Sequence, residues 1–267
     1  MCCCKVGQRW DTKQQYTRPM TPISKIVLIA CMLILPMGTD EHLFGPSTLS
    51  APQKGMDHGA WDKLLKKHVA ANGKVDYKGF VKDKKLLDAY LEHLGKNPAS
   101  EYGTKDGRLA YYINLYNAAT VKLIVDHYPV KSIKDIKNPW GREFVKVGNR
   151  TISLGELEHG ILRKMEEPRI HFAINCASTS CPDLLNEAFV SAKMGQQLEK
   201  ATKRFVNDST KNKITAGSYE LSALFKWYKK DFTTQGSLRE FINLYGEHPI
   251  TKEQKCSYLP YDWSLNE

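Results

Sequence analysis

The chain has 267 residues, of which 42% are hydrophobic and 25% are charged. This composition favours an ordinary globular protein that is long enough to bury a substantial core. The formal net charge is +10, but the basic residues are interspersed with acidic ones. They form no tract of the kind that binds nucleic acid, so we expect no nucleic-acid partner.

The N-terminal part of the chain indicates an export leader. Residues 26–37 are apolar except for one proline, a length typical of a signal-peptide core and too short for a standard membrane span. The tetrapeptide LIAC resembles a lipobox ending at Cys31, although the apolar run continues beyond it. Cleavage, retention as an uncleaved anchor and lipidation at Cys31 therefore stay open.

These features predict three parts: a leader at 1–38, a linker at 39–56 and a single globular domain at 57–267. The protein is expected to be exported, and thus periplasmic, envelope-anchored or secreted. Its N-terminal segment would allow membrane association, and export makes disulfides permissible.

The remaining sequence predicts helices mixed with short strands. Without a regular βαβ rhythm, this pattern favours an α+β fold whose helices pack on a small, mainly antiparallel sheet. Helices are expected over residues 58–71, 80–94, 108–128, 154–165, 182–189, 191–208, 223–232 and 238–245. Strands are expected in hairpins over 143–154 and 213–221, at 169–175, and in an extended piece at 258–263.

The predicted helix at 108–128 is apolar almost all round, so it is expected to be buried centrally. Asn114 and Asn117 lie three residues apart on one side of it. Buried amides need hydrogen-bond partners. These two either bind loop backbone and brace the core, or Asn114 contributes to a catalytic pocket.

The predicted helix at 154–165 places Glu158 inside its apolar stripe, with His159 and Arg163 at the flank. A buried carboxylate is costly unless it is paired or protonated. Glu158 therefore either pairs with an arginine or orients a histidine in a site, and the sequence does not choose between the two.

The stretch RIHFAINCASTSCP, residues 169–182, holds one histidine and two cysteines. If Pro182 begins a helix, Cys181 stands near its N-terminus, where the helix dipole lowers a thiol pKa. Three interpretations compete. A cysteine is a nucleophile with His171 or His159 as its base; Cys176 and Cys181 form a disulfide; or the loop binds zinc, which the spacing favours least.

Four motifs from this chain carry a family resemblance: AYYINLYNAATVKLIVDHYPVKSIKDI, SLGELEHGILR, RIHFAINCASTSCPDLLNEAF and YLPYDWSLNE. Together they resemble the family catalogued as domain of unknown function 547, over about Trp61 to Glu267. The resemblance implies that the family's Glu-His pair falls on Glu158 and His159. It also implies that the family's histidine strand followed by cysteine falls on His171 to Cys176. Plant members read Ser-Ser-Pro at 180–182, which makes Cys176 the better nucleophile.

A weaker analogy links the chain to papain-like and transglutaminase-like folds, with His171 on the histidine strand and Asp262 as the orienting acid. In that analogy the central helix carries Asn114 or Asn117 where a cysteine is expected, which implies a relocated nucleophile or an inactive relative. A fold analogy does not establish function.

Two functional hypotheses result, and the sequence does not decide whether the protein is an enzyme. In the first, Cys176 is the nucleophile of a thiol-dependent hydrolase or acyltransferase acting on an amide or peptide-like substrate. His171 or His159 is then the base, Glu158 the orienting carboxylate, and Asn114 a polar contributor. In the second, the protein is a non-catalytic cell-envelope module with a disulfide-stapled loop. Thiol–disulfide exchange is a third hypothesis. It would need Cys176 and Cys181 to cycle between thiols and a disulfide, and their spacing is not CxxC. No cofactor and no metal are expected.

Overall fold

The computed structural model describes residues 56–99, 103–215 and 217–267. The predicted leader, with its apolar segment and Cys31, lies outside these residues, as does nearly all of the linker. The division into leader, linker and domain therefore stays a prediction. Among the described residues, none of the helices combines the length and the hydrophobicity that a membrane crossing requires.

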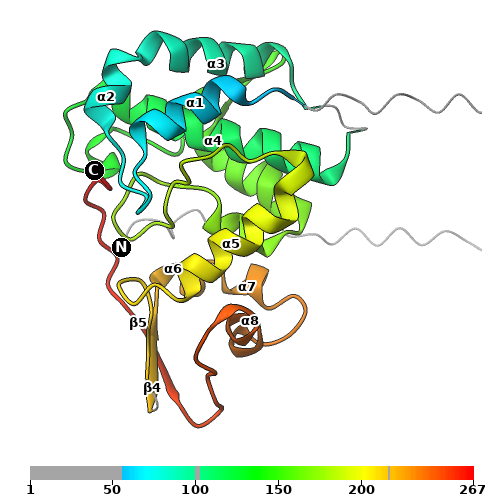
Figure 1. Cartoon of the computed structure of the whole chain (residues 1–267), viewed down its shortest axis with the longest axis vertical. Helices are drawn as coiled ribbons and strands as arrows, with labels where there is room; N and C mark the ends of the chain where they lie inside the picture. Colours follow the sequence, from blue (N-terminus) through cyan, green and yellow to red (C-terminus); the bar gives the residue numbers. More distant parts are fainter. Residues whose placement is uncertain (1–55, 100–102, 216) are drawn as a thin grey trace, which may run out of the picture. The chain divides into compact units, whose positions relative to one another are not determined.

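The described chain is mainly helical (Figure 1), with short strands in two separate sheets. The α-helices are α1 (Gly59–His68), α2 (Tyr77–Lys82), α3 (Lys84–Lys96), α4 (Lys105–His127), α5 (Met194–Val206), α6 (Ala223–Trp227), α7 (Lys229–Phe232) and α8 (Leu238–Tyr245). Shorter helical segments are η1 (Ile133–Asp135), the π-helix η2 (Glu156–Ile161), η3 (Leu162–Met165), η4 (Pro168–Phe172) and η5 (Ser191–Lys193). The strands are β1 (Glu143–Val147), β2 (Arg150–Ser153), β3 (Lys213–Ile214), β4 (Ser218–Leu221) and β5 (Lys255–Tyr258).

The long helix α4 forms the centre of the first hydrophobic core. Thr104 caps its N-terminus by accepting a hydrogen bond from the Gly107 amide, as a threonine does at a helix start. The helix ends at His127, one residue before Tyr128 and Pro129, because a residue that precedes proline is pushed out of the helical region. Buried side chains surround nearly the whole helix. The prediction of a central, buried helix is confirmed.

The second hydrophobic core is smaller and lies among α5, α6, α7 and α8. Its centre is a group of phenylalanines, in which the Phe172 ring lies 5.2 Å from Phe205 and 5.5 Å from Phe232. Ile170 and Ile174, on either side of Phe172, pack into the first core instead. The segment 170–174 therefore lies between the two cores.

The α+β fold class is confirmed. Strands β1 and β2 form an antiparallel hairpin that turns at Gly148, where φ is +58°. In the other sheet, β4 pairs antiparallel with β3 and parallel with β5. The strands thus lie in two small sheets, and the helices supply most of the core.

The C-terminal segment runs back from β5 across the domain to the region of α1 and α2 (Figure 1). The Val75 amide donates to the Asn266 carbonyl at 2.9 Å, and the Leu265 amide donates to the Lys131 carbonyl at 3.0 Å. The Thr179 amide donates to the Ser264 carbonyl at 2.8 Å. This segment therefore ties together parts of the chain that are distant in sequence, including the cysteine-containing loop.

Two predicted elements are wrong. Residues 169–175 do not form a strand, because their side chains enter two cores and the polar Asn175 and His171 are buried as well. An alternation of apolar and polar residues therefore does not separate an inner from an outer face here. Residues 182–189 form no helix, so Cys181 does not stand at a helix N-terminus. A third prediction, the helix at 80–94, is broken at Asp83, which separates α2 from α3.

Candidate active site

The buried carboxylate of Glu158 is bound by two tyrosines. It lies on the π-helix η2, where it is 5% exposed. Its Oε2 accepts a hydrogen bond from the Tyr116 hydroxyl at 3.2 Å, and its Oε1 accepts one from the Tyr228 hydroxyl. Burial and the nearby Glu158 charge raise the pKa of Tyr228 far above its usual range. The phenols therefore remain proton donors to the carboxylate.

The histidine that follows Glu158 contacts it only at long range. The Nδ1 atom of His159 is 3.7 Å from Glu158 Oε1, and its side chain is 54% exposed. Its closer neighbour is Arg163 Nη1, at 3.3 Å. The hydrogen-bond partners of Glu158 are tyrosines, and both roles considered for it from the sequence stay predictions.

A second, partly buried network joins His171, Asp231 and Arg163. Arg163 makes a bidentate pair with Asp231, at 2.6 and 2.7 Å, and His171 Nε2 lies 2.8 Å from the same carboxylate. Burial opposes ionisation of Asp231, but hydrogen bonds from Arg163 and His171 outweigh it and hold the pKa of Asp231 well below its usual range. Tyr228 connects the two networks, because its ring stacks on His171 with centroids 4.0 Å apart.

Cys176 and Cys181, called the thiol pair below, are both free and lie with their sulfur atoms 2.7 Å apart. That separation is longer than the sulfur–sulfur bond of about 2.05 Å in a disulfide. Cys181 is buried and Cys176 is partly exposed. The Cys176 amide also donates to the Cys181 sulfur at 2.9 Å. The loop thus holds the two thiols in direct contact.

The sulfur of Cys176 has two further polar neighbours. The Ser178 hydroxyl lies 3.1 Å away and the Tyr261 hydroxyl 3.2 Å away. Hydrogen bonding from Cys181, followed by that from Ser178 and Tyr261, outweighs burial and lowers the pKa of Cys176. Burial raises the pKa of Cys181 well above its usual range. One member of the thiol pair is therefore prepared to ionise and the other to stay protonated.

The backbone around the thiol pair is fixed by buried amides. Asn117 accepts from the Asn175 amide at 2.9 Å, and Asn175 in turn accepts from the Ala177 amide at 2.8 Å. Ala177 has φ of +59°, a left-handed conformation that is strained for a residue other than glycine. Backbone strain of this kind clusters at functional sites.

Asn114 lies elsewhere. Its side chain donates to the Phe189 carbonyl at 2.7 Å and accepts from the Phe189 amide at 3.0 Å. It therefore braces the 182–189 segment, which forms no helical hydrogen bonds of its own. These contacts do not connect it with the thiol pair.

The structure brings some of the predicted site residues together and leaves others apart. Cys176 lies close enough to Glu158 for the carboxylate charge to oppose ionisation of the thiol. Among the described residues, its hydrogen bonds go to Cys181, Ser178 and Tyr261, and none goes to a histidine. The pairing of Cys176 with a histidine base therefore stays a prediction.

Several site residues were not found from the sequence. They are Tyr116, Ser178, Tyr228, Asp231 and Tyr261. The signal that could have found two of them is the pair Tyr228 and Asp231 in KWYKKDF, three residues apart and flanked by apolar positions. Tyr261 lies in YLPYDW, a motif that already carried the family resemblance.

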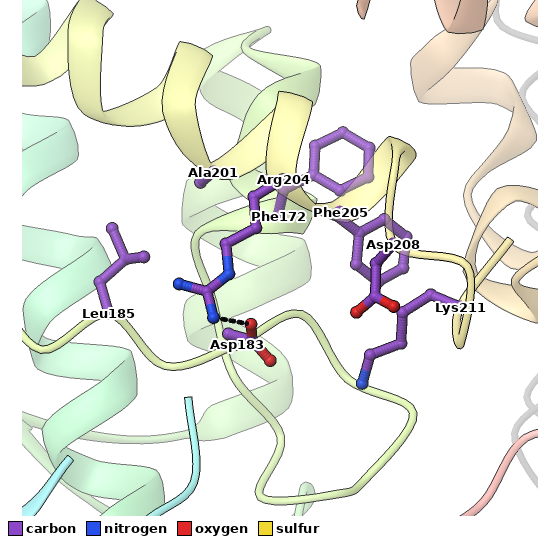
Figure 2. Close-up of a pocket in the computed structure, with 8 residues that line it drawn as sticks. All are labelled: Phe172, Asp183, Leu185, Ala201, Arg204, Phe205, Asp208 and Lys211. Atoms are coloured by element: carbon purple, nitrogen blue, oxygen red, sulfur yellow. Dashed lines mark ion pairs between the residues drawn. The ribbon is translucent and has the colours of Figure 1, made fainter. Parts of the chain in front are cut away.

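No group of three or more potential metal ligands gathers within the part of the chain that the structure describes. A small pocket near the thiol loop is lined by Phe172 and by charged residues, with Arg204 paired to Asp183 at 2.6 Å (Figure 2). Its volume is about 10 Å³, which suffices for about one water molecule and for no substrate.

The fold and site define an α+β protein with a contacting pair of unlike thiols beside a buried carboxylate and histidine network. Residues 100–206 match the family described as "Protein of unknown function, DUF547". This match includes the central helix, Glu158 and the thiol pair, and it confirms the family resemblance over these residues, which hold three of the four motifs. The motif YLPYDWSLNE lies outside the match, so the extent of the resemblance beyond 100–206 stays a prediction. No curated protein and no solved structure matches the chain. The likeness to papain and transglutaminase folds therefore stays a prediction.

Proposed function

We propose that the protein is a thiol-dependent enzyme in which Cys176 is the nucleophile and Cys181 the resolving thiol of a thiol–disulfide exchange. The observation that carries this proposal is the contact between the two sulfurs, one partly exposed with a lowered pKa and the other buried with a raised pKa. A low-pKa thiol attacks, and a protected neighbour resolves the product. The spacing CxxxxC differs from CxxC, but the two sulfurs still lie in contact, as attack of one on the other requires.

The exchange balances as follows. The Cys176 thiolate attacks one sulfur of a substrate disulfide, a mixed disulfide forms, and the other substrate sulfur leaves as a thiolate. Cys181 loses its proton to solvent and attacks the Cys176 sulfur. The second substrate sulfur leaves, so that the substrate is reduced and the thiol pair becomes a disulfide. A second dithiol must then reduce the pair for another cycle.

Acyl transfer or amide hydrolysis with Cys176 as nucleophile is the second candidate. The lowered pKa of Cys176 favours it equally, since a thiolate also attacks carbonyl carbon. It ranks second because acyl transfer needs a group that protonates the leaving amine. His171 is 2% exposed and bound to Asp231, and His159 contacts Arg163.

The non-catalytic envelope module remains a third candidate, in which the thiol pair is oxidised to a permanent structural disulfide. The contact between the sulfurs favours a disulfide in either case. An exported location is part of this proposal, because an oxidising compartment is where such a bond persists.

One experiment separates the three candidates. The full chain is equilibrated with glutathione buffers of graded potential, quenched by alkylation and mapped by peptide mass spectrometry, so that each cysteine is followed by itself. The variants are Cys176→Ser and Cys181→Ser, and the matched control is Cys256→Ser, which removes an exposed thiol outside the loop.

The expected result is a Cys176–Cys181 disulfide with a potential between about −270 and −120 mV, the range of exchange enzymes. A potential below about −300 mV contradicts exchange and identifies a structural staple. If the pair forms no disulfide while Cys176 alkylates rapidly near neutral pH, exchange is wrong and acyl transfer becomes the reaction to test.

A further inference from the structure

The thiol pair borders a continuous aromatic surface. Tyr261, whose hydroxyl lies 3.2 Å from the Cys176 sulfur, is also 4.7 Å from Trp227 and 4.6 Å from Trp263 between ring centroids. Trp263 in turn contacts Trp140, with centroids 5.5 Å apart. We call Trp140, Trp227, Tyr261 and Trp263 the aromatic surface.

The aromatic surface is partly open to solvent, mainly at Trp227. Trp227 is 46% exposed, whereas Trp61 in the first core is fully buried, and the other three rings are partly buried. Its members come from three segments far apart in sequence: the loop before β1, the end of α6 and the C-terminal segment. Tryptophan and tyrosine provide large contact areas at little cost in side-chain entropy and are enriched at the centres of binding interfaces.

The surroundings of the aromatic surface are basic. The Lys134 ammonium lies 5.2 Å from the centre of the Trp263 ring, and Lys211 donates a hydrogen bond to the Thr179 carbonyl inside the cysteine loop. Asp262, which lies between two of the rings in sequence, is exposed, and hydrogen bonds from Ser264 lower its pKa, so it adds one negative charge beside these lysines.

The segment that carries Trp140 adds further positive charge. Between residues 130 and 142 it holds Lys131, Lys134, Lys137 and Arg142 and a single acid, Asp135. The Asp135 carboxylate accepts hydrogen bonds from the amides of Lys131 and Ser132, so it serves as a local cap. An occupant of the aromatic surface therefore meets at least the Lys134 ammonium beside the Trp263 ring.

We infer that the aromatic surface docks an acidic polypeptide segment and delivers its sulfur to Cys176. This inference rests on the proposed function for the reaction and adds the substrate class. The geometry supports it because Tyr261 belongs both to the aromatic surface and to the hydrogen bonds of the thiol. A chain lying on the rings thus ends within reach of Cys176. Positive charge at the edge of the surface selects acidic segments and speeds their arrival.

The test uses the full chain carrying Cys181→Ser, so that the mixed disulfide on Cys176 accumulates and is quantified by peptide mapping. The probes are nine-residue peptides with one cysteine activated as a pyridyl disulfide. They differ only in carrying four glutamates, four glutamines or four lysines. The small neutral reference is 2,2′-dipyridyl disulfide, and each peptide rate is divided by the rate with this reference.

The acidic peptide is expected to exceed the lysine peptide by on the order of tenfold at low ionic strength, and this preference should collapse at about 1 M salt. Trp227→Ala and Lys134→Glu should each reduce the normalised acidic-peptide rate several-fold. The matched controls are Leu86→Ala and Lys85→Glu on α3, which should leave the ratio unchanged. Equal rates for the three peptides, or an unaltered ratio in Trp227→Ala, would overturn the inference.

A non-reactive probe separates docking from chemistry. The acidic peptide with serine in place of cysteine should quench tryptophan fluorescence in the wild type and should do so less in Trp227→Ala. If Cys176 reacts with no disulfide while this quenching persists, the proposed function fails and the docking site stands. If an acidic polysaccharide quenches the fluorescence and the peptide does not, the surface serves a glycan and the inference is wrong.

Discussion

Replacing Cys181 by alanine should raise the pKa of Cys176. The substitution removes the hydrogen bond that contributes most to stabilising the Cys176 thiolate, between sulfurs 2.7 Å apart. A hydrogen bond to a charged group contributes about 1.5–3 kcal/mol, and one pKa unit corresponds to about 1.4 kcal/mol. The expected rise is therefore about 1–2 units.

The assay is the rate of iodoacetamide alkylation of Cys176 across a pH series, followed by peptide mapping. At a pH below the wild-type pKa of Cys176, the alanine variant should react about 10- to 100-fold more slowly, because the thiolate fraction falls by that factor there. Cys181→Ser restores a donor and should recover part of the loss. Tyr261→Phe, which removes a hydrogen bond of 3.2 Å, should give a smaller rise than Cys181→Ala.

Two results would refute this reasoning. One is an alanine variant whose Cys176 titrates at the wild-type pH. The other is a serine variant that behaves like the alanine variant, since the donor would then be irrelevant. Cys256→Ala serves as the control for the loss of a thiol elsewhere and should leave the titration of Cys176 unchanged.

Three further predictions concern stability, measured by urea unfolding. Asn114→Ala should lower the free energy of unfolding by about 2–4 kcal/mol, because two buried backbone groups lose their partner. The pH dependence of alkylation of the thiol pair should be the same in this variant as in the wild type. Asp231→Asn should cost about 2–4 kcal/mol at pH 7 by leaving Arg163 and His171 without their carboxylate. Since the folded pKa of Asp231 is depressed, its contribution is present in full above the unfolded-state pKa of about 4 and is lost progressively as the pH falls from there towards the folded pKa. The difference between variant and wild type should therefore shrink steadily below about pH 4. Burial lowers the pKa of His58 from 6.5 to about 4, so the unfolded state takes up a proton first as the pH falls. Between these two pH values the free energy of unfolding of the wild type should therefore fall by up to about 3 kcal/mol. His58→Gln should abolish that loss. A flat difference between variant and wild type across the pH series would contradict either pH prediction.

The features that could be predicted from the sequence are those that depend on local periodicity and on the burial of single residues. The central helix, the hairpin at Gly148 and the helix at 238–245 follow from apolar spacing, capping and turn residues, and all three are present. The burial of Glu158 followed from its place in an apolar stripe, and the structure has it buried.

The identity of the partners could not be predicted, because it depends on contacts between distant segments. Glu158 meets Tyr116 from forty-two residues upstream and Tyr228 from seventy residues downstream. The wrong strand at 169–175 has the same origin. Ile170 and Phe172 belong to different hydrophobic cores, and no pattern within seven residues reveals that a segment is enclosed from both sides.

Because Tyr261 lies in the C-terminal segment, the parts of the site are synthesised at different times. Tyr261 is translated eighty-five residues after Cys176, which at ordinary rates of elongation is roughly 5–15 s later. In that interval the two cysteines exist without the phenol, and the backbone contacts from the C-terminal segment to their loop are also missing. Until the C-terminal segment has been synthesised, Cys176 therefore lacks one of its hydrogen bonds, and its loop lacks these backbone contacts. The interaction that contributes most to lowering the pKa of Cys176, with Cys181, comes from within the loop itself.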